Sequence, residues 1–331
     1  MKILIYSPLF FPSIGGTETI AGIFADEFIS AGHKVRLVTY TPTEMPDTFK
    51  FEVIRNPSKL KLLKLVKWCH LCFHITISLK GLWPLFFFKR TLAISHQTWT
   101  PQKSIIGKMK HWVFKRAINI ANSQVIASHI KAKTYIVHNA YQDTIFRKIP
   151  EINRTKEIAF LGRLVSDKGC EILLRAMAIL KEKGIVFSST IIGNGDQEDK
   201  LKYISSQLLL DEQVVFVGQK TGDELNLLLN QHFIIAIPSK WEEPFGIVAL
   251  EGLAAGCLPI VSQRGGLMEA IGNHGLSFPN GDHEALANCL EKVIVDAALR
   301  ETLMVGVDQH LESYKPKVIA KKYLDIFRQF I

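Results

Sequence analysis

Short apolar runs alternate with amphipathic segments along the chain, and this alternation starts afresh near Lys156. In the first half we expect a helix over 19–33 and strands over 2–8, 34–40, 91–96, 119–127 and 134–139. In the second half we expect a helix over 170–184 and strands over 156–164, 187–195, 213–218 and 233–239. Strands that alternate with helices build parallel sheets covered on both faces. The sequence therefore predicts an α/β protein with two doubly wound, Rossmann-like domains.

The length of the chain supports two domains. A chain of 331 residues suits two hydrophobic cores, because single cores stop growing near about 250–300 residues. The polar, proline-containing segment 147–155 is the expected linker. We therefore place the first domain at 1–148 and the second at 156–315. A cleft between the domains is expected, with ligand at the carboxyl ends of the strands.

Basic residues are concentrated in the first half. Between Glu52 and Asp143 there are fifteen Lys and Arg residues and no acidic residue, whereas the formal charge of the whole chain is only +9. Such an asymmetry indicates an anionic partner. No recognised nucleic-acid-binding motif accompanies the charge, so nucleic acid is not the expected partner.

Segment 58–90 interleaves lysine with apolar and aromatic residues. Lys61, Lys64 and Lys67 recur at steps of three and therefore lie near one face of a helix. The apolar stretch between Lys67 and Lys80 is too short to span a bilayer. The pattern favours peripheral docking of 58–90 on an anionic membrane surface. The alternative is an ordinary amphipathic helix that packs on the domain and exposes its lysines.

Cysteine usage indicates a reducing setting. The chain has five cysteines, and its apolar N-terminal run is too short for a secretory signal. We therefore expect a cytoplasmic protein without disulfides. Cys69 and Cys72 form a lone C-x-x-C pair, which is a weak zinc signal without a second pair. Neither a metal nor another cofactor is expected.

Two loops carry residue types that suit phosphate groups. Gly15 and Gly16 lie between the first strand and the first helix, where glycines let the backbone approach an anion at a helix N-terminus. Arg163 and Lys168 follow a strand of the second half, and two cations on one such loop suit a diphosphate. The alternatives are a structural glycine turn and two solvated loop cations.

The segment EPFGIVALE places Glu243 and Glu251 around a helix start. A helix that begins near Gly246 leaves the amides of Phe245, Gly246 and Ile247 without helical partners. Glu251 then lies more than one turn inside the helix, and Glu243 lies just outside it. Neither acid is needed to start the helix, so both are free to accept hydrogen bonds from ligand hydroxyls.

The longer segment PSKWEEPFGIVALEGLAAGCLPIVSQRGGLMEAI (238–271) closely resembles the retaining nucleotide-sugar glycosyltransferases of family 4, which have the GT-B fold of two Rossmann-like domains. The E-x(7)-E spacing is the most specific part of the likeness. Shorter matches run along nearly the whole chain and include GGTE (15–18), SHQT (95–98), GRLVSDKG (162–169) and IIGNG (191–195). The final segment, 316–331, resembles the helix that returns to the first domain.

The resemblance implies roles for the residues of the second half. Glu243 would accept hydrogen bonds from the donor sugar, and Glu251 would hold the ribose hydroxyls. Arg163 and Lys168 would neutralise the departing diphosphate. The family pattern places the nucleobase beside Gly218, Gln219 and Lys220.

For the first half the resemblance implies less. His96 matches the family histidine near the transferred sugar and the acceptor; the alternative is a strand-end histidine bonded to the backbone. Gly15 and Gly16 would let their loop close over the diphosphate. The sequence has no D-x-D motif, which agrees with metal-independent transfer. The basic stretch near 85–90 departs from the family, so acceptor contacts cannot be carried over.

The implied enzyme is a retaining transferase. It would move a hexose or N-acetylhexosamine from a nucleotide-diphosphate sugar to a lipid-linked or cell-envelope saccharide at the cytoplasmic membrane face, as in polysaccharide or lipopolysaccharide synthesis. The alternatives are a non-catalytic GT-B protein that binds nucleotide-sugar or scaffolds a partner, and an epimerase of the same fold. The intact Arg163, Lys168, Glu243 and Glu251 disfavour a scaffold, and the E-x(7)-E spacing disfavours the epimerase.

Overall fold

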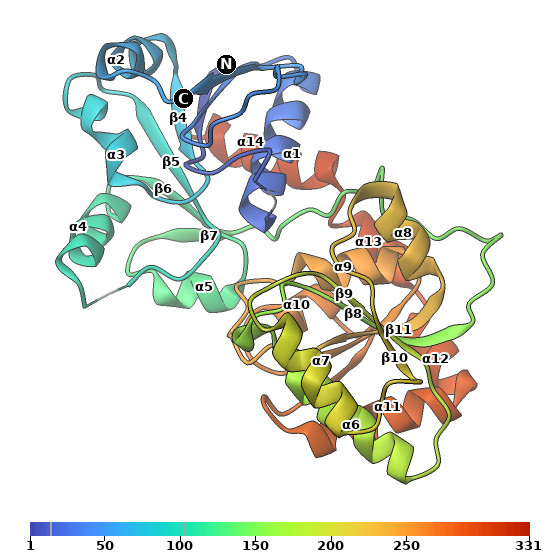
Figure 1. The fold of residues 1–331 in the computed structure, drawn as a ribbon. Coiled ribbons are helices and arrows are strands. Elements are labelled where there is room, and N and C mark those ends of the chain that lie inside the picture. The colour runs from blue at the N-terminus through green and yellow to red at the C-terminus, as the bar shows by residue number, and fades with distance from the viewer. Residues whose placement is uncertain (14, 102) are drawn as a thin grey trace. The chain divides into compact units, whose positions relative to one another are not determined.

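The computed structural model describes residues 1–13, 15–101 and 103–331, which form two compact units (Figure 1). Unit 1 comprises Met1–Ala140 and Tyr314–Ile331, and unit 2 comprises Tyr141–Ser313. Each unit contains one parallel sheet. The predicted pair of doubly wound α/β units is confirmed.

The sheet of unit 1 has seven strands in the order β3-β2-β1-β4-β5-β6-β7. The strands are β1 (Lys2–Tyr6), β2 (Lys34–Thr39), β3 (Glu52–Arg55), β4 (Leu71–His74), β5 (Thr91–His96), β6 (Ile118–Ala121) and β7 (Thr134–Ile136). The chain runs from β1 toward one edge and then returns to β4 on the other side of β1. The switch point, where doubly wound sheets open a crevice, therefore lies between β1 and β4.

Helices cover both faces of this sheet (Figure 1). They are α1 (Gly16–Ser30), α2 (Lys59–Trp68), α3 (Leu79–Leu82), η1 (Trp83–Phe86), α4 (Ile105–Phe114), α5 (Gln124–His129) and α14 (Pro316–Arg328). On one face, Phe24 of α1 packs on Tyr323 of α14 with ring centroids 4.4 Å apart, and both contact Phe73 of β4. The final helix is thus part of the core of unit 1.

Part of the strand prediction for unit 1 is wrong. The expected strand over 119–127 ends at Ala121, and α5 begins at Gln124. The reason is Ser123, whose Oγ accepts a hydrogen bond from the amide of Ile126 at 3.2 Å and caps the helix. The strands β3 and β4 were not among those expected, because β3 is short and β4 lies within the lysine-rich segment 58–90.

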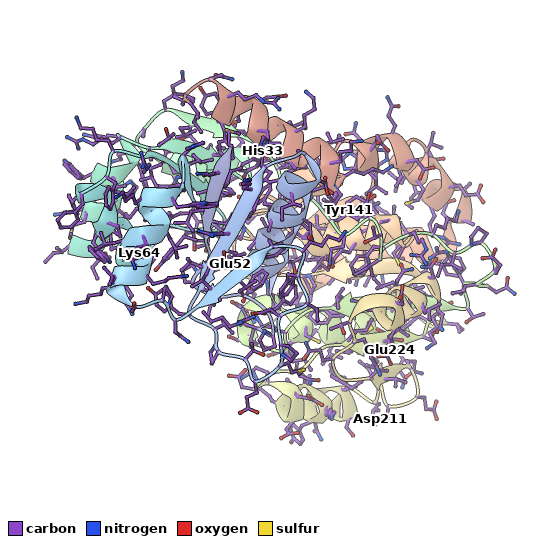
Figure 2. The ribbon with its side chains drawn as sticks, turned by 90° about the horizontal axis from the view of Figure 1, so that it is seen from above. His33, Glu52, Lys64, Tyr141, Asp211 and Glu224 are labelled. Carbon is purple, nitrogen blue, oxygen red and sulfur yellow. The ribbon has the colours of Figure 1, made fainter. Side chains whose placement is uncertain are left out.

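Segment 58–90 is integrated into unit 1. Leu62, Leu65 and Val66 of α2 are buried in the core cluster that also contains Tyr6 and Cys72. The lysines of this helix are exposed, and Lys64 is labelled on α2 in Figure 2. The apolar side of α2 therefore packs on its own sheet, which corresponds to the alternative of an ordinary amphipathic helix. Its outward side carries the lysines together with Leu60, which is 63% exposed.

The sheet of unit 2 has six strands in the order β10-β9-β8-β11-β12-β13. The strands are β8 (Lys156–Leu161), β9 (Ser189–Ile192), β10 (Val214–Phe216), β11 (His232–Ile237), β12 (Leu258–Ser262) and β13 (Leu276–Phe278). The helices are η2 (Ser166–Lys168), α6 (Cys170–Glu182), α7 (Glu198–Gln207), α8 (Gly222–Asn230), α9 (Ile247–Ala254), α10 (Leu267–Ile271), α11 (His283–Val295), α12 (Ala297–Met304) and α13 (Val307–Glu312). The switch point of this sheet lies between β8 and β11.

The segment expected as a linker, 147–155, belongs to unit 2. The amide of Ile149 donates to Oδ1 of Asn230 at 2.8 Å, and the guanidinium of Arg154 donates to the carbonyl oxygens of His232 and Ala255. These contacts tie the segment to β11 and the end of α8. Unit 2 therefore starts at Tyr141, earlier than the predicted 156.

No helix in the described part of the chain is both long and apolar enough to cross a bilayer.

Candidate functional site

The predicted ligand residues of unit 2 flank its switch point. Arg163 and Lys168 follow β8, and Glu243 follows β11. These strands are hydrogen-bonded neighbours in the sheet. Loops after the carboxyl ends of such a strand pair form the usual ligand site of a doubly wound sheet.

Lys168 and Glu243 form an ion pair at this position. Nζ of Lys168 lies 2.5 Å from Oε1 of Glu243, and the two side chains are only 24% and 13% exposed. The same carboxylate oxygen accepts a hydrogen bond from Oγ of Ser239 at 2.7 Å. Backbone contacts hold the loops together, because the amides of Lys240 and Trp241 both donate to the carbonyl oxygen of Asp167. Ser239 is not among the predicted site residues; its signal in the sequence is a hydroxyl two residues after β11 and four residues before Glu243.

Arg163 differs from Lys168 in its surroundings. Its side chain is exposed directly after β8. Within the described residues, its guanidinium contacts neither a carboxylate nor another hydrogen-bond acceptor. Lys168 is paired with Glu243, so Arg163 is the cation of this loop that has no ion-pair partner among the described residues. A guanidinium in this state can bind two phosphate oxygens at once.

Glycines bring the neighbouring loops into backbone contact. A Cβ at Gly193 would lie 1.9 Å from the carbonyl oxygen of Gly162, and the φ of Gly193 is +142°. The amide of Gly193 donates to the carbonyl oxygen of Gly218 at 2.9 Å. The glycine loop after β9 therefore lies directly between the Arg163 loop and the predicted nucleobase segment.

The segment predicted to lie beside the nucleobase, 218–220, is at least partly accessible. Gly218 has a φ of +70°, Gln219 is exposed, and Nζ of Lys220 is paired with Glu224 at 2.6 Å. Because Lys220 is already engaged by its neighbour on α8, recognition at 218–220 would depend mainly on the backbone and on Gln219.

The segment around Gly246 is built as predicted. The helix α9 begins at Ile247, and Gly246 precedes it with a φ of +103°. A Cβ at Gly246 would lie 2.4 Å from Cδ2 of Leu267, so a side chain has no room there. Phe245 is 1% exposed and anchors the turn. The first amides of α9, starting at Ile247, have no acceptors within the helix.

Glu251 lies in the second turn of α9, away from the cap. Burial raises the pKa of its carboxyl group to about 7. No described residue donates a hydrogen bond to this carboxylate. A buried acid without donors favours its neutral form, and hydrogen bonds from ligand hydroxyls would favour the charged form.

In unit 1, the loop with Gly15 and Gly16 carries its own carboxylate. Gly15 precedes α1 in an extended conformation, and Ile14 lies outside the described residues. The side chain of Glu18 is buried over Gly15, and its Oε1 accepts a hydrogen bond from Oγ of Ser13 at 2.9 Å. An acid in the first turn already complements the helix N-terminus. Glu18 therefore reduces the attraction of this loop for an anion.

His96 lies at the end of β5, as predicted, but it is buried. His96 is only 3% exposed, and its Nε2 lies 3.0 Å from Oδ1 of Asn119. Burial lowers the pKa of His96 to about 4, so the ring is neutral at pH 7. The ring is therefore held by the side-chain amide of Asn119, whereas the alternative given above was a strand-end histidine bonded to the backbone. No motif or spacing in the sequence singles out Asn119.

The described residues contain no group of three or more His, Cys, Asp and Glu side chains that could hold a metal ion. Cys69 and Cys72 are buried in the core of unit 1. Burial raises the pKa of the Cys69 thiol to about 12. Both residues therefore act as apolar core residues here.

Comparison with known proteins finds similarity to glycosyltransferases. Residues 142–304 match the family model described as "Glycosyl transferases group 1". An uncharacterized glycosyltransferase of Methanocaldococcus jannaschii is 36% identical over 176 residues, which are 52% of this chain and 45% of that protein. A D-inositol 3-phosphate glycosyltransferase of Salinispora tropica is 28% identical over 196 residues, 56% of this chain and 40% of that protein. The chain matches less than half the length of each relative.

Solved structures match the whole chain. The Anabaena protein HepE, in a crystal structure with UDP and glucose, has a TM-score of 0.83 at 19% identity over 100% of both chains. WaaG, described as a glycosyltransferase involved in lipopolysaccharide biosynthesis, has a TM-score of 0.73 at 14% identity over 98% of this chain and 99% of its own. At these identities the likeness shows the fold, and it confirms the GT-B class predicted from the sequence.

Proposed function

We propose that this protein transfers a hexose or N-acetylhexosamine from a nucleotide-diphosphate sugar to a saccharide acceptor, because residues 142–304 match the model of group 1 glycosyl transferases. The observation that carries the proposal is the arrangement at the switch point of unit 2. There Arg163, which has no ion-pair partner in the described part of the chain, lies on the same loop as Lys168, which is paired with Glu243.

The donor is a nucleoside diphosphate bearing a sugar. The structure of HepE with UDP and glucose supports this class of ligand for a protein of the same fold. In this proposal Gly218, Gln219 and Lys220 lie beside the base, and Glu251 accepts hydrogen bonds from the ribose hydroxyls. Gln219 is exposed, and the carboxylate of Glu251 accepts no hydrogen bond from a described residue, so both can take part in these contacts.

In this proposal the reaction depends more on stabilisation of the departing diphosphate than on a general base that removes a proton from the acceptor. Arg163 and Lys168 supply positive charge where negative charge develops, and the first amides of α9, at Ile247 and beyond, supply further donors. Glu243 accepts hydrogen bonds from the sugar hydroxyls once the diphosphate engages Lys168. We further propose, on the family resemblance, that transfer retains the anomeric configuration and needs no metal. The neutral, buried His96 is placed near the acceptor in the same proposal.

The acceptor is a lipid-linked or cell-envelope saccharide, used at the cytoplasmic face of a membrane. Two structural neighbours support this class: WaaG, and a lipopolysaccharide outer core galactosyltransferase, WaaB, with a TM-score of 0.75 at 15% identity. The acid-free, basic stretch of unit 1 also suits an anionic surface.

Replacing Glu243 by glutamine should separate the two roles of the ion pair. The neutral amide frees Lys168 for the diphosphate, so the free nucleoside diphosphate should bind about fivefold tighter, the scale of a partly exposed ion pair. Sugar turnover should nevertheless fall at least about tenfold, because a charged acceptor for sugar hydroxyls is lost. Calorimetric titration and a turnover assay measure the two effects.

The neighbouring Glu242 supplies the control. Glu242→Gln removes the same charge from an exposed side chain that lies 4.0 Å from Arg264. We expect little change in either measurement. If Glu242→Gln and Glu243→Gln behaved alike, the Lys168–Glu243 pair would not be part of the donor site.

A transfer assay tests the proposed function as a whole. The purified protein is incubated with labelled nucleotide sugars and a membrane lipid and saccharide extract, and both sugar transfer and nucleotide release are followed. We expect one donor to be consumed. If nucleotide sugars bind but none is consumed with any extract, the non-catalytic alternative replaces the transferase.

A further inference from the structure

The most exposed apolar helix face in unit 1 belongs to α4. Ile105, Ile106, Met109 and Trp112 are 79%, 59%, 53% and 53% exposed. Their spacing puts them on one side of a helix with about 3.6 residues per turn. Phe114, on the other side, is buried in the core of the unit. We call the four exposed residues the apolar stripe of α4.

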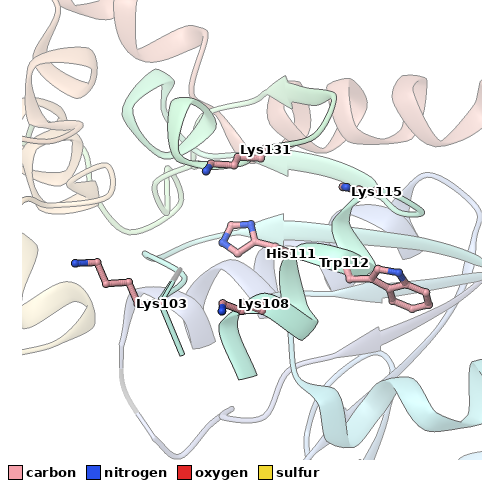
Figure 3. Close-up of a pocket in the computed structure, with 6 residues that line it drawn as sticks. All are labelled: Lys103, Lys108, His111, Trp112, Lys115 and Lys131. Carbon is pink, nitrogen blue, oxygen red and sulfur yellow. The ribbon is translucent and has the colours of Figure 1, made fainter. Parts of the chain in front are cut away.

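Lysines border this stripe. A hollow of about 770 Å³ lies beside α4 and is lined by Lys103, Lys108, His111, Trp112, Lys115 and Lys131. Figure 3 shows the His111 ring between the side chains of Lys108 and Lys131. Trp112 contributes to both the stripe and the hollow, so the two features form one continuous surface.

Among the residues that the structure describes, the lysines of this surface are not paired with acidic side chains. The sequence has no acidic residue between Glu52 and Asp143. Within the described part of the chain, none of the four lysines of the hollow is paired with a carboxylate. The ring nitrogens of His111 have no hydrogen-bond partner among the described residues either. The hollow thus holds several cationic groups that lack anions.

We propose that the apolar stripe of α4 and the lysine-lined hollow form a docking surface for an anionic phospholipid bilayer. The stripe enters the boundary between headgroups and acyl chains, Trp112 lies at headgroup depth, and lipid phosphates occupy the hollow. An interfacial helix has this layout, with apolar residues along one line and lysines beside it. Aliphatic residues such as Ile105 and Ile106 have no base-stacking role, so a nucleic acid fits the surface less well.

This proposal moves the membrane contact away from segment 58–90. In α2 the apolar residues Leu62, Leu65 and Val66 face the core, and the outward side carries lysines together with the exposed Leu60. Phe86 and Phe87 are exposed as well, but they lie after this helix, at the end of η1. The two helices therefore form a natural pair for comparison. Both carry basic residues, but α4 alone of the two combines them with an exposed apolar stripe of this extent.

Co-sedimentation of the full-length protein with vesicles tests the proposal. We expect binding to vesicles of phosphatidylcholine with phosphatidylglycerol and much weaker binding to phosphatidylcholine alone. The variant Lys103→Gln/Lys108→Gln/Lys115→Gln should lower vesicle affinity at least about tenfold at low salt. The control Lys61→Gln/Lys64→Gln/Lys67→Gln changes the net charge equally and should lower it less than about threefold, because α2 contributes only long-range attraction.

The apolar stripe is tested separately with Ile105→Ser/Met109→Ser. Both side chains are exposed, so the fold should be kept, which circular dichroism checks. Affinity should fall by a factor that persists at high salt, whereas the effect of the α4 lysine variant should shrink. Equal losses from the α2 and α4 lysine variants would overturn the proposal. So would an unchanged affinity of the serine variant, displacement of the wild type by inorganic phosphate, or binding to RNA but not to vesicles.

Discussion

The variant Arg163→Ala is expected to turn over its nucleotide-sugar donor about 10²–10³ times more slowly than the wild type, by analogy with the loss of one preorganised charge-stabilising group. The structure gives the reason. Lys168 is paired with Glu243 at 2.5 Å, so Arg163 is the cation of this loop without an ion-pair partner among the described residues. Without Arg163, no unpaired cation among the described residues of this loop is available to the departing diphosphate.

The fold should tolerate this change. Arg163 is exposed and has no described partner, so its replacement should alter the free energy of unfolding by less than about 0.5 kcal/mol. Arg175→Ala is the matched control, since Arg175 is also an exposed arginine of unit 2 but pairs with Glu171 on α6. Arg163→Lys should recover part of the rate, because it keeps the charge and loses the planar fork. Unimpaired turnover in Arg163→Ala would refute the diphosphate assignment.

The second large effect concerns Glu251 and pH. Burial raises the pKa of this carboxyl from its ordinary 4.5 to about 7 in the folded protein. A raised pKa means that the neutral acid stabilises the fold below about pH 4.5, and that this stabilisation is lost as pH rises through about 7. The loss amounts to about 3 kcal/mol, because each pKa unit corresponds to about 1.4 kcal/mol. Glu251→Gln cannot ionise and should therefore be more stable than the wild type at pH 8.

Denaturant unfolding of both proteins between pH 4.5 and 8 measures this difference. Other buried groups make the wild-type curve complex, since burial lowers the pKa values of His74, His96 and His232 and adds stability as pH rises toward about 6.5. Subtracting the two curves cancels these groups. Glu301→Gln, at an exposed position of α12, should leave the curve unchanged. Parallel curves for the wild type and Glu251→Gln would show that Glu251 is ionised like an ordinary surface acid.

Most of unit 2 could be predicted from the sequence because its signals are local. Continuous apolar runs, such as those of β8 and β11, are typical of buried parallel strands, and glycines mark the loops that follow them. The proline and the glycine before Ile247 predict the start of α9 there. Residue types and spacing in this unit determine both the elements and the loops that carry the site.

Unit 1 was harder to predict because tertiary context decides its structure. β4 is four residues long and lies in a lysine-rich segment, yet it is a central strand, since Leu71 and Phe73 are fully buried. In α2 the spacing of the lysines predicts a helix with a basic face, but spacing alone does not determine whether the apolar side contacts lipid or protein. In the structure the apolar side of α2 packs on the sheet of unit 1.

Contacts between site residues that lie far apart in the sequence could not be predicted from the sequence. Lys168 and Glu243 are 75 positions apart, and their contact depends on β8 and β11 being neighbours. The same holds for His96 and Asn119, which meet because β5 pairs with β6. Individual candidates can be named from a motif, whereas their protonation and charge balance require the fold.

The measurement that tests the central claim most directly is the thermal unfolding of the purified protein with a panel of UDP, GDP, ADP, CMP and dTDP and their common sugars. A ligand at about 100 times its dissociation constant adds about 2.7 kcal/mol to the free energy of unfolding. We predict stabilisation by one nucleoside diphosphate and its sugar, and loss of that stabilisation in Arg163→Ala. An intact fold that none of these nucleotides stabilises, or equal stabilisation of wild type and Arg163→Ala, would contradict a donor site at the switch point of unit 2.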